Sequence, residues 1–341
     1  MLRRVALLAL LGACGGSYGG GPHEPAHATK APAAGIEGAA LPYDIVDART
    51  GRQVDPAAFW TKVESSRAVC IGEDHTNPHH HWVQLEVMRR IAHDAPAGTK
   101  LALGMEMVQR PFQGVLDDYA AKRIDAAALR SRTGWEDRWG YDFGFYGPTI
   151  DTAVAAGAQL LALNAAKELT KKVVHHGIEG LTPDERAQLP ELELTNATHR
   201  AWFDAMMESM GGAEAHSAPA SSQPGDEGTE SAPPMPVEHE MPSADRIYTV
   251  QVIWDESMAD GTARWLAATP NGHAVILAGN GHCHDSAIVG RIKRRGIPEV
   301  ISLRPVLDTE GQVAEALVKP VNDYLIVLRL PPGTKAEEQS H

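Results

Sequence analysis

The sequence predicts an α/β fold with a mostly parallel central sheet flanked by helices. Short apolar runs alternate with amphipathic stretches along most of the 341 residues, which is the pattern of such folds. Apolar residues make up 43% of the chain and charged residues 22%, as in globular domains with a buried core. We therefore expect one domain over residues 41–330 and a polar tail over residues 331–341.

The expected elements follow from run length and spacing. Six apolar runs have the length of buried strands: residues 68–72, 101–105, 159–163, 274–278, 300–303 and 324–328. Six amphipathic stretches predict helices: residues 78–92, 111–121, 148–156, 195–210, 244–268 and 285–294. Residues 182–185 read Thr-Pro-Asp-Glu, a capping box with proline at the first helical position, which predicts one more short helix.

The first forty residues have the pattern of an export signal followed by a tether. Arg3 and Arg4 precede the apolar run 5–11, which is too short to span a bilayer, and small residues lead to Cys14. This signal over residues 1–13 resembles a bacterial lipobox with Cys14 as the lipidated residue; the alternative is a plain secretory signal. Residues 14–40 are rich in Gly and Pro and predict a flexible tether. Both alternatives predict export, and the first predicts anchoring at the outer membrane or cell surface.

A second low-complexity stretch covers residues 211–243. It is rich in Gly, Ala, Ser and Pro, has several carboxylates and contains no Lys or Arg, so we expect a disordered acidic insertion within the domain. The whole chain has 31 basic and 44 acidic residues, a formal net charge of −13. This balance argues against nucleic acid as a partner, because a phosphate backbone is bound through positive charge.

Imidazoles and carboxylates follow three of the predicted strands. Glu73 and His75 follow the first strand, Glu106 the second and His282 the fourth. Ligands of open α/β sheets bind beyond the carboxyl ends of strands, so we expect these four residues to meet in one crevice if their strands are neighbours. The set suits a divalent metal, or a general acid and base pair without one. Each residue taken alone has an ordinary capping or hydrogen-bonding alternative.

Other polar and aromatic residues admit two interpretations. At most one or two of His79, His80 and His81 should reach the crevice while the others face solvent, because successive helical residues point about 100° apart. Cys70 reads as a buried small hydrophobe and Cys283 lies nearer the crevice; the two can pair in an oxidising compartment. The aromatic segment 135–146 suits either core packing or a flat apolar ligand surface.

The long predicted helix carries a polar face. Tyr248, Gln251 and Asp255 recur at a spacing of three and four residues, so they share one side of the helix. Phenol, amide and carboxylate groups on one face can line a pocket. The alternative is an ordinary solvated face.

Several motifs in order resemble the ChaN family of haem-binding uptake lipoproteins, within the wider Tiki and erythromycin esterase superfamily. The motifs are Gly72-Glu73-Asp74-His75 with His81, Glu106 to Arg110 with Gln113 and Leu116-Asp117, Leu163-Asn164, Gln251 to Asp255 with Met258-Ala259, and Gly279 to His282. The resemblance implies an α/β fold, membrane anchoring through Cys14, haem binding coupled to homodimer formation, and a role in bacterial iron acquisition.

The resemblance leaves the haem ligand open, and Tyr or His are suitable donors to haem iron. The candidates for haem binding are Tyr248, Tyr146, Gln251, Asp255 and His81. The alternative function is a metal-dependent protease or esterase that uses Glu73, His75, Glu106 and His282, because enzymes of the superfamily use a similar constellation. A third interpretation is an exported scaffold with a relic site.

Overall fold

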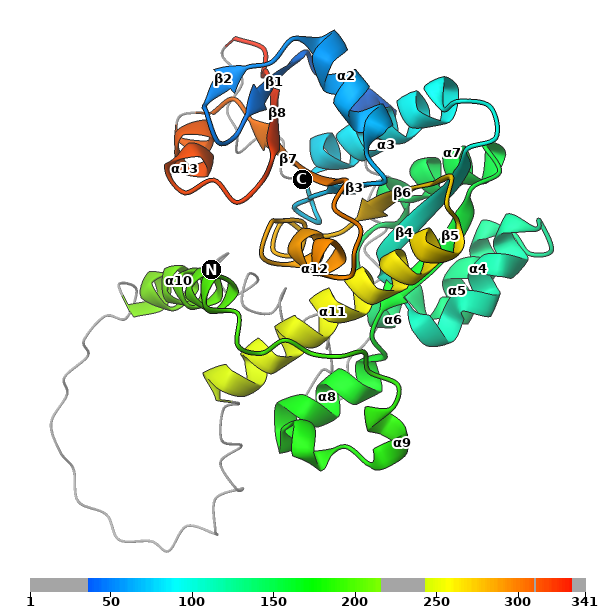
Figure 1. The fold of residues 1–341 in the computed structure, drawn as a ribbon, viewed down its shortest axis with the longest axis vertical. Coiled ribbons are helices and arrows are strands. Elements are labelled where there is room, and N and C mark those ends of the chain that lie inside the picture. Colours follow the sequence, from blue (N-terminus) through cyan, green and yellow to red (C-terminus); the bar gives the residue numbers. More distant parts are fainter. Residues whose placement is uncertain (1–35, 216–242, 310, 333–341) are drawn as a thin grey trace, which may run out of the picture.

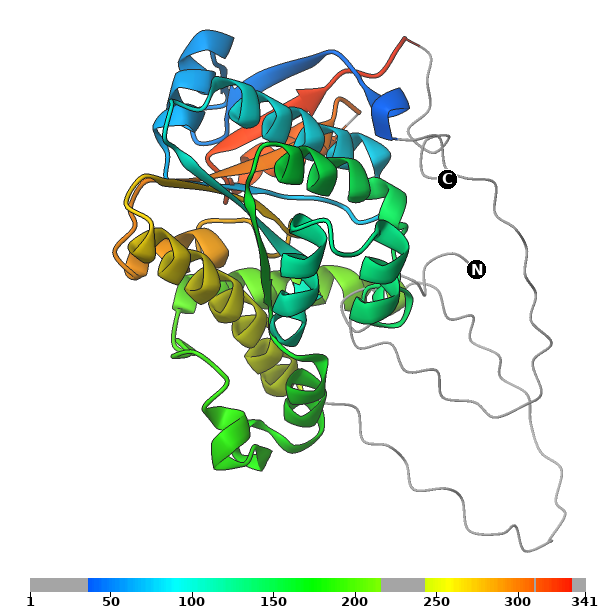
Figure 2. The same ribbon diagram turned by 90° about the vertical axis from the view of Figure 1, so that its right-hand side faces the viewer.

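The computed structural model describes residues 36–215, 243–309 and 311–332. Over this part of the chain, helices cover both faces of one eight-stranded sheet (Figures 1 and 2). The strands are β1 (Tyr43–Asp47), β2 (Arg52–Gln53), β3 (Ala68–Ile71), β4 (Lys100–Gln109), β5 (Gln159–Asn164), β6 (Gly272–Leu277), β7 (Val300–Leu307) and β8 (Tyr324–Leu328).

The sheet is mostly parallel, which confirms the predicted fold class. Its strand order is β2-β1-β8-β7-β3-β6-β4-β5. The pairs from β8 through β5 are parallel, whereas β1 runs antiparallel to both β2 and β8. The chain passes from β3 to β4 and β5 and then returns to insert β6 between β3 and β4. The carboxyl ends of β3, β6 and β4 therefore lie side by side, as a common strand-end site requires.

The helices complete the fold. They are α2 (Pro56–Ser65), α3 (Pro78–Asp94), α4 (Gln113–Ala120), α5 (Ala126–Thr133), α6 (Trp135–Arg138), α7 (Gly147–Ala155), α8 (Lys167–His176), α9 (Pro183–Arg186), α10 (Ala197–Ala215), α11 (Ala244–Ala268), α12 (Ile288–Arg294) and α13 (Gln312–Val318). Four 3-10 turns join them: η1 (Ile36–Ala39), η2 (Arg110–Phe112), η3 (Phe143–Phe145) and η4 (Ile178–Gly180). Among the described helices, none is long and apolar enough to cross a membrane.

Two apolar layers sandwich the sheet. Helices α2, α3, α4 and α7 pack on one face, with β3 contributing Val69 and Ile71 to that layer. Helices α8, α11 and α12 pack on the other face, with β3 contributing Ala68 and Cys70. This alternation follows from the pleat of a strand, which sends successive side chains to opposite faces. Burial on both faces explains why the strands read as continuous apolar runs.

The six predicted strands and the six predicted helices are present, most of them with shifted ends. The capping box at Thr182 is confirmed, since its side chain accepts from the Glu185 amide while the Glu185 carboxylate accepts from the Thr182 amide. Sequence reasoning missed β1, β2, α2, α5, α6, α8 and α13. Strand β1 is half-buried at an antiparallel edge and mixes polar and apolar residues, so it lacks the apolar run that marks a central strand.

Several predictions concern residues outside the described ranges. The signal over residues 1–13, the lipidation site Cys14, most of the tether and the end of the polar tail lie there. So do residues 216–242 of the expected insertion. The first five residues of that insertion, 211–215, are helical because α10 continues to Ala215, which corrects the expected boundary.

Candidate functional site

The strand ends bring together the four residues that the sequence singled out. Figure 1 shows β3, β6 and β4 as neighbours at the centre of the fold. Glu73 and His75 follow β3, His282 lies in the loop after β6, and Glu106 lies within β4. We call Glu73, His75, Glu106 and His282 the strand-end cluster.

Glu106 reaches the cluster because β4 extends beyond the end of its neighbour β6. The expected strand ended at Met105, but β4 continues to Gln109, with a register irregularity against β5 between these two residues. Its other neighbour, β6, ends at Leu277, opposite Met105. Glu106 therefore extends past the end of β6, where its Oε2 accepts a hydrogen bond of 2.7 Å from the Gly279 amide. A bulge that redirects a side chain next to a site is a common device in sheets.

Close backbone approach depends on two glycines. A Cβ atom at Gly279 would lie 3.1 Å from His75 Cε1 and 3.7 Å from Glu106 Oε2. A Cβ atom at Gly72 would lie 2.2 Å from Asn280 Oδ1. Only glycine lets the loop after β6 lie this near the residues after β3 and β4.

Glu73 is the buried centre of one half of the cluster. Its Oε1 accepts hydrogen bonds from His75 Nδ1 and the Tyr146 hydroxyl, both at 2.7 Å, and its Oε2 accepts one from Gln84 Nε2 at 2.6 Å. Burial alone would raise the pKa of Glu73, but the charges of His81 and His75 and these hydrogen bonds lower it to about 2. Glu73 is therefore an ionised carboxylate that fixes the His75 ring.

His75 is the most accessible member of the cluster, with 21% of its side chain exposed. Its ring contacts the rings of Trp139 and Tyr141, with centroid distances of 4.7 Å in both cases. Burial lowers the pKa of His75, but the hydrogen bond and charge of Glu73, followed by the charge of Glu106, raise it above the ordinary value. The ring nitrogen that Glu73 does not bind, Nε2, lies beside Gly279.

His282 is held from both sides. Its Nε2 lies 3.4 Å from Glu106 Oε1, and its Nδ1 lies 2.7 Å from Asp255 Oδ1 on α11. Burial lowers the pKa of His282, but the charge of Glu106 and the hydrogen bond to Asp255 raise it to about 9. His282 is therefore an imidazolium at neutral pH, and the cluster contains alternating carboxylates and imidazoles.

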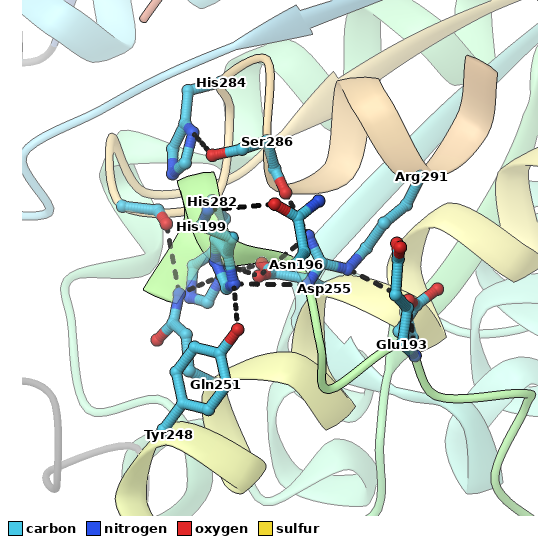
Figure 3. Close-up of polar contacts among 12 residues, drawn as sticks. Glu193, Asn196, His199, Tyr248, Gln251, Asp255, His282, His284, Ser286 and Arg291 are labelled. Atoms are coloured by element: carbon cyan, nitrogen blue, oxygen red, sulfur yellow. Dashed lines mark hydrogen bonds and ion pairs between the residues drawn. The ribbon is translucent and has the colours of Figure 1, made fainter. Parts of the chain in front are cut away.

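Behind His282 lies a further buried network, shown in Figure 3. Gln251 donates to the Gly281 carbonyl at 3.1 Å. Asp255 Oδ2 lies 3.1 Å from His199 Nε2 on α10, and the Tyr248 hydroxyl lies 3.3 Å from His199 Nδ1. The polar face predicted on the long helix thus contacts the site and is not an ordinary solvated face.

The five haem-binding candidates all lie inside the protein. Each exposes 3% or less of its surface. Each is also engaged internally, Tyr146 with Glu73, His81 with the His75 carbonyl, and the three residues of α11 in the network of Figure 3. Tyr146 and His81 lie beside Glu73 and His75, whereas Gln251 and Asp255 lie beside His282.

The expectation that one or two of His79, His80 and His81 face solvent is wrong, because all three are buried. The loops around the start of α3 cover them. His79 Nδ1 contacts the Ala39 carbonyl of η1 at 2.6 Å, His80 Nδ1 accepts from the Asp74 amide at 2.9 Å, and the His81 ring stacks on Phe145 of η3.

Sequence reasoning missed His199 and Arg291. His199 is one histidine in a helix remote in sequence from every motif, so only the fold reveals it. Of the two interpretations of the aromatic segment 135–146, core packing is confirmed for part of it. Trp135, Trp139 and Tyr146 pack in the core, whereas Tyr141, Phe143 and Phe145 are only partly buried.

Cys70 and Cys283 form a disulfide with a Cα–Cα distance of 5.4 Å. Both residues are fully buried. The sequence left their pairing open. Cys70 lies in β3, the strand that Glu73 and His75 follow. Because Cys283 follows His282, the bond ties the His282 loop to the central strand.

The donor set gives no support to a divalent metal at the cluster. Within the described ranges, no group of three or more His, Cys, Asp or Glu side chains is arranged to hold a metal ion. Each imidazole Nδ1 of the cluster instead lies 2.7 Å from a carboxylate. The four residues form pairs with one another and do not converge on one point.

The fold and the cluster define an α/β protein with buried carboxylates and imidazoles gathered at the carboxyl edge of its sheet. Residues 59–299 match the family model described as "Haem-binding uptake, Tiki superfamily, ChaN". This match spans well over half of the chain, and the chain belongs to that family.

The chain is similar to several solved structures. ChaN of Campylobacter jejuni, described with cofacial haem binding, is similar with a TM-score of 0.60 and 15% identity, covering 84% of this chain and 96% of that chain. The erythromycin esterase EreC in its open conformation is a weaker likeness, with a TM-score of 0.40 and 13% identity over 83% of this chain and 82% of that one. No curated protein matches the chain.

Proposed function

We propose that this protein binds haem at the strand-end cluster, with the His75 imidazole as the donor to iron. Membership of a haem-binding uptake family supports haem as the ligand. The cofacial haems described for ChaN of Campylobacter jejuni support a shared site between two copies, so we also propose a homodimer.

The hydrogen bond and the exposure of the His75 side chain give this proposal its main support. Its Nδ1 lies 2.7 Å from the Glu73 carboxylate. Its side chain is more exposed than those of the other three members of the cluster. A carboxylate that accepts from one imidazole nitrogen orients the ring and raises the basicity of the other nitrogen toward a metal. Imidazole is a usual donor to haem iron. His75 therefore has the chemistry and the access that haem requires.

The surroundings of His75 suit a flat apolar ligand. The rings of Trp139 and Tyr141 flank its imidazole at 4.7 Å. Partly buried Phe143 and Phe145 continue the aromatic surface along the same segment. Aromatic side chains form the walls of most cofactor sites, with few polar groups placed to fix orientation.

A haem titration of the purified mature protein tests the proposal. We expect a saturable shift of the Soret band together with a change from monomer to dimer in sedimentation velocity. A Soret spectrum that never saturates, with no change in sedimentation, would reject haem binding. Saturation without dimerisation would reject only the homodimer.

We further propose that the protein is an exported lipoprotein that takes part in iron acquisition. The lipobox-like signal at Cys14 supports the anchor, and the buried disulfide supports an oxidising compartment. Incorporation of labelled palmitate in the producing bacterium should be lost in Cys14→Ser. A deletion strain should grow poorly with haem as its sole iron source, and wild-type growth would contradict the role in acquisition.

Acid–base hydrolysis is a second candidate function, favoured by one observation. Glu106 and His282 face each other at 3.4 Å, with Asp255 on the far side of the His282 ring. A carboxylate and an imidazole at this separation can exchange the roles of general base and acid. Turnover of an ester panel that is abolished in Glu106→Gln while haem binding persists would support it. Absence of turnover by the wild-type protein would dismiss it.

A further inference from the structure

A buried chain of contacts reaches from His282 to residues outside every recognised motif. His282 Nδ1 contacts Asp255 Oδ1 at 2.7 Å, Asp255 Oδ2 contacts His199 Nε2 at 3.1 Å, and His199 Nδ1 contacts Arg291 Nη2 at 3.2 Å. Figure 3 shows these side chains converging from α10, α11, α12 and the loop after β6. All four residues are at least nine-tenths buried.

The hydrogen-bonding capacity of arginine fixes the proton on His199. A guanidinium has donors and no acceptor, so the His199 Nδ1 that faces Arg291 must carry a lone pair. The Tyr248 hydroxyl, 3.3 Å from the same nitrogen, can donate to it as well. The ring proton of His199 therefore resides on Nε2, the nitrogen that lies 3.1 Å from Asp255 Oδ2.

Asp255 therefore has an imidazole close to each of its oxygens. Its Oδ2 lies 3.1 Å from His199 Nε2 and 3.8 Å from Arg291 Nη1, while its Oδ1 faces His282 Nδ1 at 2.7 Å. Burial raises the pKa of Asp255, but the charge of Arg291 and the contacts with His199 and His282 lower it well below the ordinary value. An Asp255 carboxylate held in this way fixes the orientation of the His282 ring, with Nδ1 directed at Asp255.

Trp202 packs against two of the imidazoles of this region. Its ring stacks on His199 with an interplanar angle of 14° and lies 4.3 Å from the ring of His284. Low local polarity strengthens each contact in such a network. The chain therefore has the burial needed to impose one arrangement on His282.

We propose that His199 and Arg291 are positioning residues, which hold Asp255 and through it fix the His282 ring with Nδ1 protonated and Nε2 presented to Glu106. They come from α10 and α12, two helices that supply none of the strand-end cluster. The geometry of the free protein does not depend on haem. The effect on haem affinity does rest on the proposed function.

Imidazole NMR on the haem-free protein tests the geometry. Long-range proton–nitrogen correlations should show a lone pair on Nδ1 and a proton on Nε2 in His199, and a proton on Nδ1 in His282. His199→Leu should shift the His282 nitrogen resonances, because Asp255 loses the polar ring that lies 3.1 Å from its Oδ2. His199→Gln should restore them, since the glutamine amide can donate from nearly the same place as Nε2.

Tyr248→Phe is the matched control, because Arg291 still donates to His199 when the hydroxyl is gone. We expect its His282 resonances to match those of the wild-type protein. A wild-type spectrum with the proton of His199 on Nδ1 would overturn the proposal even if no variant folds. Unchanged His282 resonances in a folded His199→Leu would overturn it too.

A haem titration of the same variants separates the two proposals. We expect His199→Leu to weaken haem affinity by about tenfold, the loss of roughly one charge-assisted contact, and His199→Gln to recover most of it. If the NMR result holds but no variant or wild-type protein binds haem, the positioning chain stands and the haem function falls. If haem binds equally to both variants, His282 has no part in haem affinity.

Discussion

At the scale of single residues, Gly279 sets the spacing of the whole cluster. The loop after β6 passes so close to His75 and Glu106 that a Cβ atom would crowd both side chains. Gly281, two residues further on, has room for a Cβ atom, since its nearest neighbour would be Trp202 Cη2 at the ordinary distance of 3.5 Å. The two positions therefore make a matched pair.

Gly279→Ala should impair haem binding far more than Gly281→Ala does. The added methyl lies 3.3 Å from His75 Nε2, so the imidazole must move away from its binding position. The effect on folding should be small, because overpacking costs only about 1–3 kcal/mol of stability. Soret titrations and urea unfolding of both variants measure the two effects. Equal haem affinity in the two variants would contradict the assigned position of His75 Nε2.

The titration of buried histidines predicts how stability depends on pH. The pKa of His282 is raised from 6.5 to about 9, so its contribution is fully present below pH 6.5 and is lost as pH rises toward 9. The pKa of His284 is lowered to about 3 by burial, so its contribution is present above pH 6.5 and is lost as pH falls. Stability should therefore be greatest near neutral pH.

Urea unfolding between pH 5 and pH 10 checks this prediction, with His282→Gln as the informative variant. That variant should lose stability at neutral pH and show a flatter alkaline limb, because it has no imidazolium to deprotonate. An alkaline limb as steep as that of the wild-type protein would show that another group is responsible.

Residues that follow strands could be predicted from the sequence, and residues that meet through tertiary packing could not. Glu73, His75, Glu106 and His282 were found together because parallel strands end at one edge of a sheet. His199 and Arg291 reach the same region from two helices, and no local spacing relates them to the motifs. The burial of the haem candidates was equally invisible, since it depends on how the surrounding loops cover them.

At the scale of elements, β4 and the disulfide shape the site. The length of β4 was underestimated because Glu106 and Gln109 interrupt its apolar run, although the structure extends the strand through both. Strand β3 and helix α11 were predicted closely, because each has the continuous pattern of its kind. Strands β1 and β2 were missed because they lie at the half-polar edge of the sheet, where a sequence pattern is weak.

Removal of the disulfide should destabilise the fold and loosen the His282 loop. Cys70 and Cys283 are 213 residues apart in sequence, and closing so long a loop restricts the unfolded chain strongly, by about 2–5 kcal/mol in such models. The double variant Cys70→Ala with Cys283→Ala, compared by urea unfolding with the oxidised wild-type protein, measures this. Equal stability would show that packing alone holds the loop.

At the scale of the whole molecule, a sheet covered on both faces presents one chemically distinct edge. Apolar layers stabilise the two faces, so polar side chains can gather where β3, β6 and β4 end. This division separates the residues that stabilise the fold from the residues that determine the chemistry at that edge. It also explains why the fold class followed from the sequence, whereas the ligand rests on the family and the proposal.

The central claim is that haem binds through His75, and the comparison of His75→Ala with His93→Ala tests it most directly. His93 lies near the end of α3, the helix that follows His75, with 86% of its side chain exposed and its Nδ1 2.7 Å from Asp94 Oδ1. We expect His93→Ala to give the Soret band and affinity of the wild-type protein, and folded His75→Ala to lose the ligated spectrum. An unchanged Soret band in His75→Ala would contradict the account.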